Sequence, residues 1–259
     1  MLRLVTIPIS HYCEKARWAL QRAGLDYREE PHVQGIHRIY ARRAGGSSTV
    51  PVLVTPDGAL GESEQILEWV DERIAPEHRL FGDDPAERER ILTLSRRLDE
   101  RLGPTGRRLI YVRMFDQPEL MLRFNNQGVP VWEDRFIRHG LPFAQRFIAR
   151  ALEITPGIER EDESTVWSEF DWVAEMLSDG RPYLLGERFT AADLTFASLA
   201  APVVLPAVYG VALPPLESLD RPTAALVTRG REHPAGAFAL RLSDERRCGA
   251  GRLVLGPEG

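Results

Sequence analysis

The first 75 residues alternate short apolar runs with helical patterns, and this order constrains the fold more than any other feature of the sequence. Apolar runs of four to six residues predict strands, while apolar positions three or four apart predict helices. The expected strands cover 2–7, 26–33 and 50–55, with PDGAL as a tight turn into a fourth, and the expected helices cover 12–23, 37–44 and 64–74. The order is therefore β-α-β-α-β-β-α, and we expect an α/β domain over residues 1–79.

The sequence becomes almost entirely helical after the stretch FGDDPAERER, which is interpreted as a linker. An all-helical domain is expected over 85–243, and the glycine-rich stretch 244–259 is expected to be a disordered tail. The helices of this second domain are predicted over 85–102, 107–124, 132–153, 162–178 and 223–241.

One uncharged stretch, 194–213, is long enough to cross a bilayer, but Pro202, Pro206 and Gly210 interrupt it. We interpret it as a buried core helix that ends near Pro202, and we expect no membrane partner.

The formal net charge of −5 argues against a nucleic-acid partner, which usually requires a basic surface. The only two cysteines, Cys13 and Cys248, are too few and too far apart for a disulfide framework, so a reduced, cytoplasmic setting is expected. The six histidines are scattered without metal-ligand spacing, and no metal site is expected.

Three short motifs lie where strands meet helices. The first is Ser10-His-Tyr-Cys13 at the start of the first helix, where partial positive charge and free N–H groups favour an anion such as a thiolate. Ser10 is either a simple helix cap or a functional hydroxyl, Cys13 is either a buried small residue or a nucleophile, and His11 is expected to be an exposed turn residue. The others are Val50-Pro51 and Glu62-Ser63, the latter expected to cap the helix over 64–74.

In this order, these motifs resemble those of the cytosolic glutathione transferase family, in its bacterial-type, Ser/Cys-motif form. The later stretch YLLGERFTAADLTFASL is similar to the family's helical-domain signature, with Thr190 and Asp193 as structural capping residues. The resemblance covers residues 2 to about 241 and implies a thioredoxin-like N-terminal domain followed by an all-helical C-terminal domain. It also implies a homodimer that uses glutathione as co-substrate in the detoxification of electrophiles.

The resemblance assigns roles to individual residues. Val50, the cis-proline Pro51, Glu62 and Ser63 are expected to bind glutathione, and Thr49 stands where the family commonly has Lys or Gln. The small-molecule electrophile is expected between the two domains, on Tyr111, Met114 and Phe115, which indicate an apolar or aromatic substrate.

Three functions remain open on the sequence. The favoured one is a transferase in which the Ser10 hydroxyl stabilises the thiolate of glutathione. The second is an oxidoreductase or lyase that uses Cys13, and the third is a non-catalytic binding or regulatory protein on the same fold.

Overall fold

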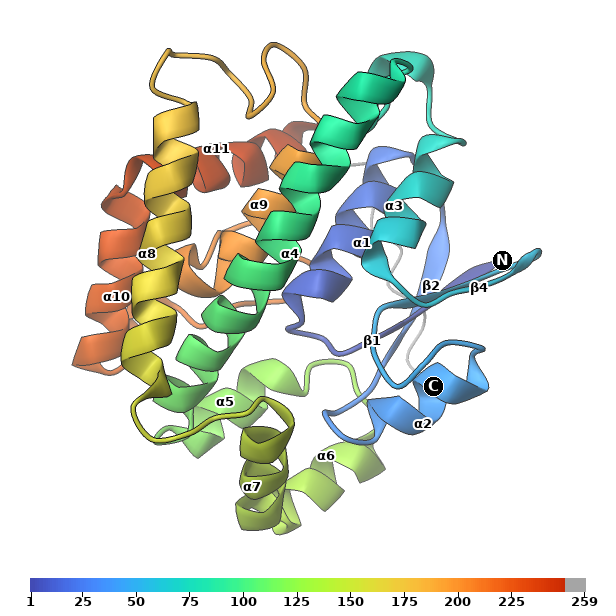
Figure 1. Ribbon diagram of the computed structural model, residues 1–259. Coiled ribbons are helices and arrows are strands. Elements are labelled where there is room, and N and C mark those ends of the chain that lie inside the picture. Colours follow the sequence, from blue (N-terminus) through green and yellow to red (C-terminus); the bar gives the residue numbers. More distant parts are fainter. Residues whose placement is uncertain (250–259) are drawn as a thin grey trace.

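The computed structural model describes residues 1–249 of the protein (Figure 1). The strands are β1 Leu2–Thr6, β2 Tyr27–Pro31, β3 Val52–Thr55 and β4 Gly58–Leu60. The helices are α1 His11–Arg22, α2 His37–Arg43, α3 Ser63–Asp71, α4 Pro85–Met114, α5 Pro118–Asn125, α6 Val131–His139, α7 Leu141–Ala151, α8 Ile158–Met176, α9 Ala191–Val204, α10 Arg221–Glu232 and α11 Pro234–Gly249, with short 3-10 helices η1 Pro76–His78 and η2 Leu216–Ser218.

The four strands form one mixed sheet in the order β2-β1-β3-β4, with β1 and β2 parallel and the other pairs antiparallel. Successive side chains point to opposite faces of a strand. Leu4 and Leu53 therefore pack with α1 and α3, while Val5 and Val52 pack with α2 on the other face. A thioredoxin-like domain followed by helices was expected from the sequence, and this fold class is confirmed.

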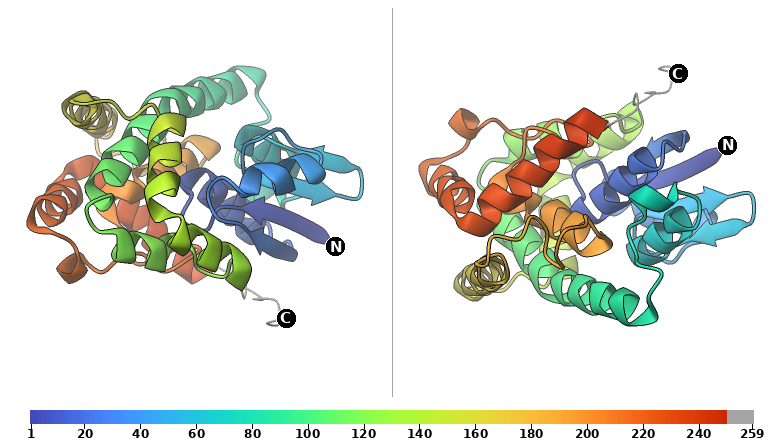
Figure 2. Two further views of the ribbon diagram at one scale, coloured as in Figure 1. Left: turned by 90° about the horizontal axis from the view of Figure 1, so that it is seen from below. Right: turned by 90° about the horizontal axis from the view of Figure 1, so that it is seen from above.

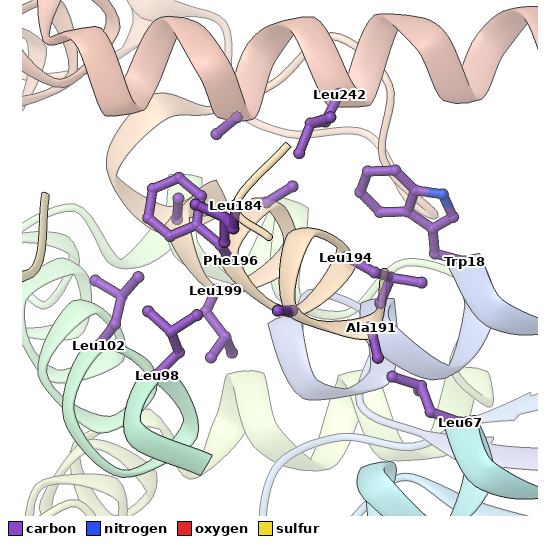
Figure 3. Packing of buried hydrophobic residues seen from close by; sticks show 14 of the residues in the cluster. Trp18, Leu67, Leu98, Leu102, Leu184, Ala191, Leu194, Phe196, Leu199 and Leu242 are labelled. Carbon is purple, nitrogen blue, oxygen red and sulfur yellow. The ribbon is translucent and has the colours of Figure 1, made fainter. Parts of the chain in front are cut away.

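Helix α9 forms the centre of the helical part, with α4, α10 and α11 packed against it and α8 packed on α4 and α11 (Figures 1 and 2). Its side chains are almost all buried, as expected for the uncharged stretch, and Figure 3 shows Leu194, Phe196 and Leu199 among leucines from α4 and α11. The helix runs through Pro202 to Val204, slightly further than predicted. Among residues 1–249, no helix combines the length and the apolar character that a bilayer crossing needs.

Helix α4 is continuous over 85–114, whereas two helices with a break near Pro104 were expected. An internal proline costs about 3 kcal/mol, but Leu98, Leu102 and Leu109 are fully buried on both sides of it. We infer that this packing keeps the helix intact. The second expected helix is instead the last part of α4 followed by α5, and the helix expected over 132–153 is divided at Gly140 into α6 and α7.

Two further expectations about helix ends were wrong. Glu62, not Ser63, occupies the N-cap position of α3, and the Glu62 side chain makes no capping hydrogen bond. The helix ends at Asp71, three residues before the expected end at residue 74. Helix α11 extends to Gly249, so residues 244–249 of the expected disordered tail are helical. The rest of that tail, 250–259, lies outside the described residues, and the limits 1–79 and 85–243 remain predictions.

Helix α1 lies between the sheet and the helical part and buries charged side chains against both (Figure 2). Lys15, the only lysine of the chain, pairs with Asp99 of α4 at 2.7 Å, and the Tyr12 hydroxyl donates to the Asp99 carbonyl at 2.8 Å. Buried Glu14 accepts from the backbone N–H of Gly210 at 3.0 Å and pairs with Arg246 of α11. Because breaking a buried ion pair costs about 3–5 kcal/mol, these contacts fix the first turn of α1 against the helical part.

Candidate functional site

Ser10 lies between β1 and α1 and caps the helix. Its backbone is extended, with φ −66° and ψ 122°, and its Oγ accepts a long hydrogen bond of 3.4 Å from the Cys13 N–H. Since the hydroxyl accepts there, its own proton can still be donated, either to the neighbouring Cys13 sulfur or to a ligand. Ser10 is therefore a cap, as expected, that also offers a donor at the positive end of α1.

Cys13 is fully buried in the apolar side of α1. Burial raises the pKa of its thiol from 9.0 to about 11, against the opposing effects of Arg17 and the Ser10 hydroxyl. A thiol with this pKa is almost entirely protonated at neutral pH, so this environment disfavours Cys13 as a nucleophile.

His11 is buried, with only 3% of its surface exposed, so the expectation of an exposed turn residue was wrong. Burial first, and then the cations Arg107 and Lys15, lower its pKa from 6.5 to about 3, while the Gly103 backbone acts in the opposite direction. The imidazole is therefore neutral at physiological pH. Its Nε2 is buried and has no hydrogen-bond partner among the described residues.

The sheet brings the three sequence motifs to one edge. Val5 pairs with Val52, so the antiparallel register carries the Val50-Pro51 segment to the end of β1 that leads into Ser10. Leu60 pairs with Leu53, so the chain leaves β4 toward the same edge and enters α3 there. The motifs are therefore neighbours in the fold, although Ser10 and Ser63 lie 53 positions apart in the sequence.

The predicted glutathione-binding residues differ in exposure. The Val50–Pro51 peptide bond is cis, with Val50 half-buried and Pro51 buried. Thr49 is exposed and hydrogen-bonds to Ser47 at 2.7 Å. Glu62 is exposed just before α3, and Ser63 is buried in its first turn.

A cavity of about 100 Å³ lies beside Ser10, between the sheet and the helical part. Tyr111 and Met114 line it, as predicted, but Phe115 does not; it packs edge-on against Tyr111, with ring centroids 6.2 Å apart. Most of the wall is apolar and comes from Ile7, Ile9, Ile110, Met121, Phe124, Leu205, Leu213 and Leu219.

Polar groups also reach this cavity. The Tyr111 hydroxyl donates to Gln34 at 2.7 Å and accepts from Asn125 at 3.3 Å. Burial raises its pKa to about 12, so it remains protonated. The Tyr209 hydroxyl donates to the Ile9 carbonyl at 3.1 Å and holds the 205–215 loop beside Ser10. Gln34, Asn125 and Tyr209 were not predicted, because they come from a loop, a short helix and another loop without a recognisable motif.

The predicted structural pair is in place at the start of α9. Thr190 and Asp193 form a reciprocal capping box, in which one Asp193 oxygen accepts from the Thr190 N–H and the other from the Leu184 N–H, both at 2.8 Å. No group of three or more His, Cys, Asp or Glu side chains in residues 1–249 is arranged to hold a metal ion.

Comparison with known proteins agrees with this geometry. Residues 4–78 match the family profile described as "Glutathione S-transferase, N-terminal domain". No curated protein matches the sequence.

Solved structures extend the likeness to nearly the whole chain. A glutathione S-transferase from Xanthobacter autotrophicus Py2 is 17% identical, with a TM-score of 0.60 over 93% of this chain and 92% of the other. One from Sinorhizobium meliloti 1021 is 20% identical, with a TM-score of 0.56 over 93% and 92%. A glutathione-bound one from Methylobacillus flagellatus KT is 15% identical, with a TM-score of 0.53 over 92% and 98%. The chain thus has the fold of the glutathione transferases, and its residues 4–78 match the N-terminal domain of that family.

Proposed function

We propose that this protein is a glutathione transferase that joins the thiol of glutathione to an apolar or aromatic electrophile. The observation that carries the proposal is the position of Ser10. Ser10 lies at the N-terminus of α1 and is one of the residues that line an apolar cavity between the two parts of the molecule. A thiolate held there would face any electrophile in the cavity.

The chemistry requires ionisation of the thiol, which has a pKa of about 8.5 in free cysteine. A hydrogen bond donated by Ser10 and the partial charge of the helix N-terminus both favour the thiolate, and each unit of lowered pKa corresponds to about 1.4 kcal/mol. The thiolate then attacks the electrophilic carbon; a C–S bond forms, and the leaving group departs with its electron pair. Holding both reactants in one site supplies the remaining rate increase.

The edge of the sheet would hold the rest of glutathione. We propose that the Val50 backbone, beside the cis-proline Pro51, pairs with the cysteinyl part. Glu62 and Ser63 would bind the γ-glutamyl end, because an acidic side chain suits the ammonium and a helix N-terminus suits the carboxylate. Thr49 would face the glycyl end.

The alternative in which Cys13 carries out redox chemistry is disfavoured by its burial and its raised thiol pKa. A homodimer, expected from the family resemblance, also remains a proposal. Light scattering should give twice the mass of one chain, and the mass of a single chain would contradict the dimer.

Calorimetric titration with reduced glutathione tests the binding site. We expect the wild type to bind and a Glu62→Ala, Ser63→Ala double variant to lose binding by tenfold or more, since each lost charged hydrogen bond costs about 1.5–3 kcal/mol. Glu72→Ala, at the exposed far end of α3, is the matched control and should bind normally. Absence of binding by the wild type would refute the proposal and favour a non-catalytic role.

A further inference from the structure

Arg107 of α4 differs from its neighbours on the same helix because it has no carboxylate partner. Arg101 pairs with Glu169, Arg108 with Asp162 at 2.6 Å, and Arg113 with Glu159 at 2.8 Å. Among the side chains described for residues 1–246, that of Arg107 forms no ion pair and no hydrogen bond; the residue is half-buried, and its Nε is buried without a partner. It points to the side of α4 that lines the cavity beside Ser10.

The surroundings of Arg107 leave this positive charge uncompensated. No Asp or Glu is among the residues that line the cavity. The centroid of the Tyr12 ring lies 5.9 Å from the guanidinium carbon, too far for more than a weak cation–π contact. The positive charge of Arg107 acts on two other residues that line the cavity. It lowers the pKa of His11, and it partly offsets the increase in the pKa of Tyr111 that burial causes.

His11 also lines the cavity, and its Nε2 is buried without a hydrogen-bond partner. The backbone hydrogen bond with Gly103 raises the pKa of His11, so the other ring nitrogen carries the proton of the neutral imidazole. Arg107 is therefore the donor that this part of the cavity wall offers to a ligand. A mostly apolar cavity whose wall carries one guanidinium without a carboxylate partner is suited to an anion with an apolar body, because the anion can form a charge-assisted pair there.

We propose that the electrophile conjugated by this protein carries a carboxylate, which binds to Arg107 while its apolar part packs on Ile110, Met114 and Met121. The inference rests on the proposed transferase function for the reaction, but the anion site itself does not require catalysis. A carboxylate fits because the planar guanidinium pairs with it through two parallel hydrogen bonds, and because the cavity is small.

Binding of benzoate and benzamide tests the site without any reaction, because the two probes have nearly the same shape and differ in charge. By calorimetry, the wild type should bind benzoate more tightly than benzamide. The Arg107→Met variant should bind benzoate at least about tenfold more weakly than the wild type does. Its affinity for benzamide should differ from that of the wild type by less than about twofold. Arg123→Met on α5 removes the same charge from an exposed position outside the cavity and should change neither.

Arg107→Lys keeps the positive charge and should recover part of the benzoate affinity, which separates a lost contact from a misfolded variant. Equal affinity of the wild type for the two probes, or equal losses for both in Arg107→Met, would overturn the proposal.

Kinetics test the same site in the reaction. With glutathione, a chloronitrobenzoate and its amide both form a C–S bond while chloride leaves with the C–Cl electron pair. Arg107→Met should raise KM for the benzoate by about tenfold, with KM for the amide and for glutathione unchanged. A protein that conjugates neither compound would refute the transferase function, and the benzoate titration would still decide the anion site.

Discussion

The native protein should protect Cys13 from alkylation, and the size of this protection can be worked out from its environment. Replacing Cys248 by Ser leaves Cys13 as the only thiol of the chain. Raising the thiol pKa from 9.0 to about 11 reduces the thiolate fraction near neutral pH by about 100-fold. A thiolate of higher pKa is intrinsically more nucleophilic, which offsets roughly tenfold of this.

Together, the lower thiolate fraction and the higher nucleophilicity predict that Cys13 reacts with an alkylating reagent about tenfold more slowly than a small free thiol does. Burial adds to it, because a reagent cannot reach a sulfur with no exposed surface until the structure opens. We therefore expect iodoacetamide to modify Cys13 at least about tenfold more slowly than N-acetylcysteine, followed as mass change over time. The same variant in denaturant is the control and should react like the small thiol.

Alkylation of native Cys13 as fast as that of N-acetylcysteine would refute this reasoning. It would show an accessible, activated thiolate and would favour the oxidoreductase function over the Ser10 mechanism.

Other predictions concern stability. Asp193→Ala should lower the free energy of unfolding by about 2–4 kcal/mol, since the Thr190 and Leu184 N–H groups lose their buried acceptor; the denaturant midpoint should fall with the slope unchanged. Gly236→Ala should destabilise by about 2–3 kcal/mol or more, because its Cβ would lie 1.7 Å from the Gly230 carbonyl oxygen. Gly106→Ala, whose nearest contact would be 3.8 Å away, should instead stabilise α4 by about 0.5–1 kcal/mol in thermal unfolding. The pKa of His11 is about 3 in the folded protein and 6.5 in the unfolded chain, so between these pH values only the unfolded chain binds a proton at His11. The free energy of unfolding should therefore fall by about 1.4 kcal/mol per pH unit on acidification from 6.5 to about 3. His11→Asn should lack this contribution to the pH dependence.

Local patterns in the sequence were sufficient for most of the fold. The alternation in LRLVTI and VPVLVT, the turn at PDGAL and the Thr190–Asp193 capping pair each specify an element through contacts within a few residues. Local patterns did not place Ser10 beside the Val50-Pro51 segment; the family resemblance implied a shared site, and the pairing of β1 with β3 brings the two together.

The features that the sequence did not reveal depend on packing between distant segments. Helix α4 continues through Pro104 because buried leucines on either side hold it. His11 was predicted from the sequence to be an exposed turn residue, yet it is buried because α1 lies against the helical part. Arg107 is one of many arginines in the chain, and only the folded helix shows that it faces a cavity without an acidic partner.

The central claim, that Ser10 stabilises the thiolate of glutathione, is tested most directly by the pKa of the bound thiol. Ultraviolet absorbance of the thiolate, followed against pH in the saturated complex, measures this pKa. In the wild type, the pKa of the bound thiol should lie at least about one unit below the 8.5 of a free thiol. Ser10→Thr should keep a pKa close to the wild-type value, because it retains the hydroxyl. Ser10→Ala should raise the pKa by about one unit above the wild-type value. The same thiol pKa in the wild type and in Ser10→Ala would contradict the account.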